Sequence, residues 1–234
     1  MMRKVCLVLL VSTCAACADL SQVLNTGAQV SQAAGYNPAQ LSKGIKDALA
    51  LSVTRASEQL SESGGYSERR YRIQLPDEVQ QIEAVLAQFG LDSQINQVET
   101  LMNRGAEIAA AEAKTVFLQA LADMSVDDAI GIVRGGDTAA TEYFREQTQS
   151  SLRQRYETIM ENQLEQLGFY RQYQQLLSAY TLLPIANKPD LDLEQAAINQ
   201  GIAALFDQIA QEEVKIRENP VEQGSLLIAS VFGN

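Results

Sequence analysis

The sequence contains no histidine and no tryptophan, and its three cysteines, Cys6, Cys14 and Cys17, lie close to the amino terminus. Without imidazole, the chain cannot assemble a Ser-His-Asp or Cys-His catalytic site. It also lacks the ligand of familiar zinc sites and of the Glu-x-x-His motifs in helical di-iron bundles. These absences exclude the commonest enzymatic chemistries, and we expect no cofactor.

Aromatic residues are also scarce, at 6% of the 234 residues, whereas hydrophobic residues make up 46%. Alanine, glutamine, leucine and glutamate dominate the composition, which favours helices over strands. Positive charge is in deficit, because 18 basic residues stand against 29 acidic ones and the formal net charge is −11. An acidic surface repels phosphate backbones, so nucleic acid is not an expected partner.

The first eighteen residues have the pattern of an export signal. Arg3 and Lys4 precede an uncharged apolar stretch that is too short to span a bilayer as a helix. Two processing routes remain open: ACA (16–18) is a site for ordinary signal peptidase, whereas CAAC (14–17) offers Cys17 as a lipid acceptor. We expect a periplasmic protein, either soluble or held at the outer membrane by an N-terminal lipid anchor.

Residues 19–36 are small and polar and predict a flexible or weakly helical lead-in, followed by one domain over residues 37–234. Asn37 and Pro38 mark the start of a helix that apolar residues at three- and four-residue spacing continue to about residue 63. The same spacing, with glycine and proline as stops, predicts further helices over 76–90, 93–124, about 126–134, 138–168, 169–182, 193–217 and 219–234.

Two stretches interrupt this pattern. The alanine-rich run 109–113 suggests a break within the helix over 93–124. The alternating segment YRIQLP (71–76) predicts a short extended strap, or a minor hairpin strand, near residues 70–76. The expected fold is therefore all-α, a single irregular bundle of about seven to eight helices with one extended strap.

The adjacent glycines Gly135 and Gly136 resemble a phosphate-binding loop at first sight. A Walker loop, however, requires a following Lys and a preceding strand, and neither is present. We interpret the pair as the turn that ends one helix, with Asp137 or Thr138 capping the next. An anion at the start of that helix is the alternative.

Asn103 and Glu107 lie four residues apart, on one face of a predicted helix, with Arg104 beside them. They form either a paired polar cluster inside the fold or a solvated pair on its surface. Acidic residues elsewhere match no calcium loop, so no metal site is predicted. The aromatic run from Tyr143 to Tyr180 indicates core packing, with the lining of an apolar ligand cavity as the alternative.

Several motifs carry a resemblance to a known family. They are MNRGAE (102–107), DAIGIVRGGDTAATEYF (128–144), LPI (183–185), LFDQIAQEEVKIRENP (205–220) and the terminal VFGN. Over residues 40–234 the chain resembles domain of unknown function 4197, found in exported proteins of Gram-negative bacteria. The resemblance implies an exported all-helical domain and a role for Asn103, Glu107, Asp128, Gly136, Thr141 and Arg217, but no activity.

The absence of the usual catalytic groups, together with an apolar helical core, favours a non-enzymatic binding module for an envelope protein or an apolar, lipid-like ligand. One alternative is a carboxylate-based metal-binding or hydrolytic domain, in which Asn103, Arg104, Glu107, Asp128 and Asp137 converge on one cleft. A purely structural spacer is the other alternative.

Overall fold

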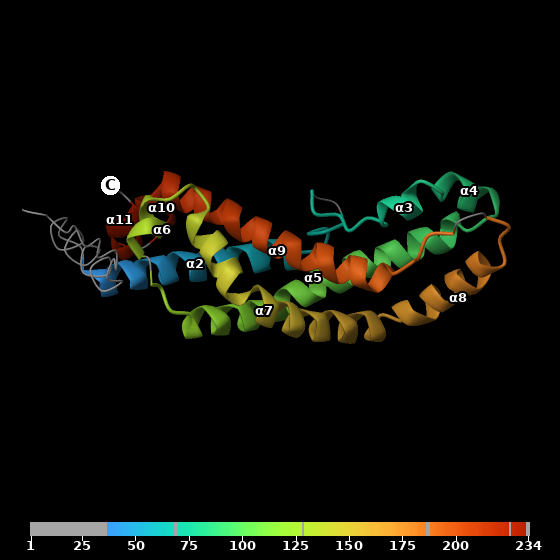
Figure 1. Ribbon diagram of the computed structural model, residues 1–234, viewed down its shortest axis with the longest axis horizontal. Helices are drawn as coiled ribbons and strands as arrows, with labels where there is room; N and C mark the ends of the chain where they lie inside the picture. Colours follow the sequence, from blue (N-terminus) through green and yellow to red (C-terminus); the bar gives the residue numbers. More distant parts are fainter. Residues whose placement is uncertain (1–36, 68–69, 128, 186–187, 225, 233–234) are drawn as a thin grey trace, which may run out of the picture.

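The computed structural model describes residues 37–67, 70–127, 129–185, 188–224 and 226–232 (Figure 1). These residues form helices and connecting loops, with no strand among them, so the all-α prediction is confirmed. The helices are α2 (Pro38–Ser61), α3 (Asp77–Gln80), α4 (Glu83–Gln88), α5 (Asp92–Asp123), α6 (Ala129–Arg134), α7 (Ala139–Gln166), α8 (Phe169–Thr181), α9 (Leu193–Glu218), α10 (Pro220–Gln223) and α11 (Leu226–Phe232).

The long helices α2, α5, α7 and α9 lie along the length of the molecule and pack against one another (Figure 1). The short helices α6, α10 and α11 gather at one end, whereas α4 and α8 lie at the other. In the part of the chain that the structure describes, no helix is long and apolar enough to cross a bilayer.

Helix α2 begins as predicted. The Asn37 side chain accepts a hydrogen bond from the Ala39 N–H at 2.9 Å, and Pro38 occupies the first helical position, where its missing N–H costs nothing. The apolar face of α2 is buried against α5 and α9. Near its start, α11 packs closely, because Gly44 presents no side chain: a Cβ there would lie 2.4 Å from Val231 Cγ2.

Helix α5 is continuous, so the break expected in its alanine-rich centre is wrong. Ala106, Ala109, Ala110 and Ala113 are all buried, which shows that the small side chains line a contact surface. Gly105 lies on the same surface, where a Cβ would stand 3.0 Å from Leu164 Cδ2 of α7. Small residues here allow neighbouring helices to approach closely.

An aromatic cluster joins three of the long helices. The rings of Phe117 (α5), Phe144 (α7) and Phe206 (α9) lie 5.3 to 6.1 Å apart, centroid to centroid. Tyr156 and Phe169 are also fully buried. Core packing is therefore the role of the aromatic run on α7 and α8, as its spacing predicts.

The segment before α5 differs from the prediction of one helix over 76–90. It forms two short helices, α3 and α4, separated by Gln81 and Ile82. The extended strap that precedes them is as expected: Ile73 and Leu75 are buried, whereas Arg72 and Gln74 are exposed. No hairpin strand is formed by the described residues of this region.

Gly135 and Gly136 form the turn between α6 and α7, as interpreted from the sequence. Gly135 is needed for space, because a Cβ there would lie 2.7 Å from Ala139 Cβ and 2.9 Å from the Gly131 carbonyl oxygen. Thr138 occupies the capping position of α7, but its hydroxyl makes no capping bond and instead donates to Glu142 at 2.8 Å. The N–H groups that begin α7 therefore have another partner.

Candidate functional site

The Asn103 side chain forms the two hydrogen bonds with the strap backbone that a neighbouring β-strand would otherwise form. Its Oδ1 accepts a hydrogen bond from the Ile73 N–H at 2.9 Å, and its Nδ2 donates to the Ile73 carbonyl at 2.9 Å. The side chain is 2% exposed, so these bonds satisfy a buried amide. Asn103 thereby fixes the strap against α5.

Glu107 closes the turn that follows α2. Its Oε1 accepts from the Gly64 N–H at 3.0 Å and from the Ser67 hydroxyl at 3.2 Å, while Oε2 pairs with Arg104 at 2.9 Å. Gly64 has φ of +81°, a conformation that favours glycine. Asn103 and Glu107 are thus buried, and each binds a different part of the same loop.

Thr141 belongs to a separate cluster around Glu213 of α9. The Glu213 carboxylate accepts from the N–H groups of Ala140 and Thr141 at 3.0 and 2.7 Å, and from the Thr141 hydroxyl at 2.6 Å. It is 1% exposed. The anion that the start of α7 attracts is therefore a carboxylate of the protein itself.

Arg217 completes this Glu213 cluster. Its guanidinium pairs with Glu213 at 2.8 Å and donates to the carbonyls of Ile132 and Val133, at the end of α6, at 3.0 and 3.2 Å. One ion pair thus joins the end of α6, the start of α7 and the last turns of α9. The resemblance had implied a role for Thr141 and Arg217, but the pattern of α9 alone does not reveal Glu213 as their partner.

Glu212 is also buried, but its side chain contacts α2, whereas that of its neighbour Glu213 contacts α7. Glu212 accepts from Gln59 of α2 at 2.9 Å and pairs with Lys215 at 2.5 Å. The three buried carboxylates therefore serve three junctions: Glu107 holds the loop after α2, Glu212 joins α2 to α9, and Glu213 joins α9 to α6 and α7.

The candidate residues do not all come together. Phe117 of α5 packs against Phe144, in the second turn of α7, and lies ten residues from Glu107, or about 15 Å along the helix. The Asn103, Arg104 and Glu107 group is accordingly distant from Thr141. Asp137 is exposed at the turn before α7.

Asp128 and Cys17 lie outside the described residues. Within the described ranges, no group of three or more acidic residues is placed to hold a metal ion.

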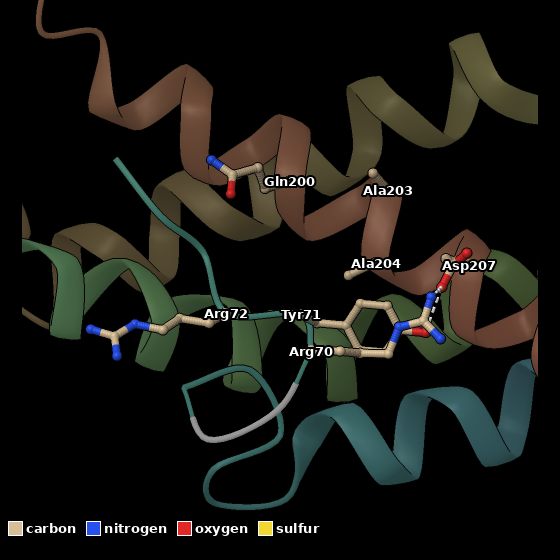
Figure 2. A pocket seen from close by; sticks show the side chains of 7 residues that line it. All are labelled: Arg70, Tyr71, Arg72, Gln200, Ala203, Ala204 and Asp207. Atoms are coloured by element: carbon tan, nitrogen blue, oxygen red, sulfur yellow. Dashed lines mark hydrogen bonds and ion pairs between the residues drawn. The ribbon is translucent and has the colours of Figure 1, made fainter. Parts of the chain in front are cut away.

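Two pockets lie on the surface of the molecule on either side of α9, and both are lined in part by Ala203. The first pocket, of about 310 Å³, is formed by the strap and α9 (Figure 2). Here the Asp207 carboxylate pairs with Arg70 at 2.8 Å and accepts from the Tyr71 hydroxyl at 2.7 Å. Burial and the bond to Asp207 raise the pKa of Tyr71.

The second pocket, of about 150 Å³, lies between α7 and α9. It is lined by Arg145, Gln149, Arg153, Asn199, Ile202, Ala203 and Phe206, and we call it the two-arginine pocket. No carboxylate is among these residues, although the chain is strongly acidic. Sequence patterns gave no indication of this pocket, because its two walls lie about fifty residues apart in the chain.

A family model described as "Protein of unknown function (DUF4197)" matches residues 35–233, which is nearly the whole chain. No curated protein matches the sequence, and no solved structure matches it either.

Proposed function

Because this chain belongs to the DUF4197 family, a family of unknown function, we propose a role from its geometry: it is an exported, non-enzymatic binding protein. The partner, a protein, docks where α9 is exposed between the strap and α7. We call this region the α9 surface, made of the two pockets and Ala203 between them.

The observation that carries the proposal is the position of the two pockets. They adjoin at Ala203, an exposed residue with a small side chain, so that a partner can reach both at once. Both linings mix charged and amide side chains with a few apolar ones. Such a surface suits the side chains of a protein better than a lipid-like ligand, which calls for an apolar enclosure.

The partners of the buried carboxylates favour binding over catalysis. Glu107, Glu212 and Glu213 each accept hydrogen bonds that hold helices or loops in place. A general acid or base must have a free position beside a substrate, and these three face the protein interior. The carboxylate-enzyme alternative has correspondingly less support.

The spacer alternative predicts a chain without surface hollows and with tolerance to change at Asn103 and Glu107. Pockets beside α9 and the burial of both side chains favour a binding role instead. Export remains a proposal based on the sequence of residues 1–18, with Cys17 as the lipid acceptor if lipoprotein processing occurs. Mass spectrometry of the mature amino terminus distinguishes the two processing routes.

The docking surface is tested with a photoreactive amino acid placed at position 203 and, as a control, at position 111. Ala111 is also an exposed alanine in the middle of a long helix, but it lies on α5, away from both pockets. On irradiation of intact cells, we expect a discrete cross-linked protein from position 203 and none from position 111. The same products from both positions, or none from position 203, would contradict the proposal.

A blocking variant gives a second measurement. Ala203→Trp fills the junction of the two pockets without entering the core, and Ala111→Trp is its matched control. We expect Ala203→Trp to abolish co-purification of the cross-linked partner while thermal unfolding stays unchanged. Native mass spectrometry that finds a bound lipid in the purified protein would favour the apolar-ligand role instead.

A further inference from the structure

Arg145 differs in its surroundings from four other arginines of the chain. Arg70, Arg72, Arg104 and Arg217 each pair with a carboxylate at 2.8 or 2.9 Å. Arg145 forms no ion pair with any described residue, and its Nε is fully buried without a hydrogen-bond partner. A half-buried cation without a counter-charge is unfavourable, and an anion in the pocket that reaches the Nη groups would supply that charge.

The two Nη groups of Arg145, unlike its Nε, are not enclosed by the protein, and they donate to no described residue. The central carbon of the guanidinium lies 4.8 Å from the centroid of the Phe206 ring, so the ring covers one side of the group. This contact is electrostatic and uses none of the guanidinium N–H groups as hydrogen-bond donors. A carboxylate is the acceptor that matches the paired donors of a guanidinium edge.

Arg153 provides a second cation on the same face of α7. Arg145, Gln149 and Arg153 follow at intervals of four residues, so the two arginines lie about 12 Å apart along the helix. Arg153 donates only to a neutral group among the described residues, the Gln195 side chain, at 3.2 Å. Glu213, which binds the preceding turn of α7, is already paired with Arg217.

The remaining residues of the pocket fit a peptide between these two cations. Gln149 and Asn199 offer neutral amides, while Ile202, Ala203 and Phe206 provide apolar contacts. In an extended peptide, residues four apart are separated by about 13 Å, close to the spacing of the two arginines. The volume of about 150 Å³ suits side chains of a peptide better than a drug-sized ligand.

We propose that the two-arginine pocket binds an acidic peptide segment of the partner, with one carboxylate at Arg145 and a second, four residues away, at Arg153. This inference rests on the proposed binding role of the α9 surface and names the chemistry recognised there. The net charge of −11 opposes any acidic ligand at long range. Binding is therefore confined to a place where unpaired cations lie together.

The test uses the full mature chain and synthetic peptides with blocked ends. Isothermal titration measures binding of acetyl-Glu-Ala-Ala-Ala-Glu-amide and of its analogue with glutamine at both acidic positions. We expect the glutamate peptide to bind and the glutamine peptide to show no binding. We expect Arg145→Gln to weaken binding about tenfold to a hundredfold, the range for a lost charge-assisted hydrogen bond.

Arg171→Gln is the matched control, because Arg171 is an exposed arginine on α8 and its replacement changes the net charge equally. It should leave the affinity unchanged. Arg145→Lys keeps the charge but loses the paired donors, and it should still weaken binding, which separates recognition from simple attraction. Equal affinities for the two peptides, or an unchanged affinity in Arg145→Gln, would overturn the inference.

Two further probes test whether the pocket binds any anion rather than the side chains of an acidic segment. If inorganic phosphate, or a penta-alanine peptide with a free carboxyl terminus, binds as tightly as the glutamate peptide, recognition of an acidic segment is disproved. Cross-linking at position 203 without peptide binding would leave the docking proposal standing and remove only this inference. Peptide binding without a cross-linked partner would show that the pocket recognises acidic peptides, but it would remove the proposal that a partner protein docks on the α9 surface.

Discussion

The interface between α7 and α9 contains two charged groups whose surroundings differ. At the start of α7, the buried Glu213 has a cation, two backbone N–H groups and a hydroxyl as partners, all from this chain. One turn further along α7, Arg145 lies against an aromatic ring and has no anion among the described residues. The first charge is fully paired within the fold, whereas the second has no counter-charge among the described residues.

This difference separates two uses of polar residues. A buried charge with a complete set of partners specifies how helices meet, and its loss leaves those partners unsatisfied. A charge that lacks partners contributes little to the stability of the folded state, so its replacement should cost little. The comparison predicts opposite responses to substitution at sites only a few residues apart.

The largest expected effect is at Glu213. Glu213→Ala leaves the partly buried Arg217 without its anion and the start of α7 without an acceptor, so the free energy of unfolding should fall by about 3–5 kcal/mol. Chemical denaturation followed by circular dichroism measures this loss. Glu146→Ala, at an exposed position on α7, is the control and should change stability by less than about 0.5 kcal/mol. A similar loss of stability in both variants would show that Glu213 contributes no more to the fold than an exposed glutamate.

The two arginines provide the sharpest contrast. Arg217→Met leaves Glu213 buried and unpaired, and it should destabilise the protein by about 3 kcal/mol or more. Arg145→Met removes a cation that has no ion pair, and stability should stay within about 1 kcal/mol of the wild type, since only a stacking contact is lost. The difference in unfolding free energy between the two variants is the measured quantity. Equal losses would show that Arg145 is also a structural residue.

An intermediate effect is expected at Asn103, a neutral side chain that is buried and, like Glu213, hydrogen-bonded within the fold. Asn103→Ala leaves the N–H and carbonyl of Ile73 without their partners, which should cost about 1–3 kcal/mol. Hydrogen exchange should become faster at the Ile73 amide than at amides within α2, because the strap alone is released. Uniform acceleration across the chain would indicate global destabilisation instead.

The smallest effect concerns tyrosine ionisation at high pH. Burial raises the pKa of Tyr156 above its ordinary value near 10. The folded state therefore keeps a phenolic proton that the unfolded chain releases, so the stabilising contribution is complete below about pH 10 and declines above it. Tyr156→Phe should reduce the fall in unfolding free energy above pH 10 by up to about 1.4 kcal/mol per pH unit. An unchanged slope would contradict this assignment.

The features that sequence analysis predicted well are local. Asn37 and Pro38 are adjacent, and their side chains alone determine where α2 begins. Gly135 and Gly136 likewise mark a turn whose geometry depends on a few neighbouring residues. The alternating burial of the strap was also predictable, because it follows from a period of two in one short segment.

The features that were missed depend on contacts between distant segments. The cap of α7 is supplied by Glu213, 72 residues away from Thr141, where a local Asp137 or Thr138 was expected. The continuity of α5 depends on burial of its alanines by other helices, which no property of the run itself indicates. The two-arginine pocket similarly requires α7 and α9 to be placed side by side.

The close fit of Val231 against Gly44 has a consequence for the order of assembly. Helix α11 covers part of α2, so α2 cannot bury its whole apolar face until almost the entire polypeptide has been synthesised. A topology closed by such long-range contacts folds late and slowly compared with one built from sequential neighbours. For a chain translocated through a membrane before folding, as proposed, that delay keeps the precursor extended until it reaches its destination.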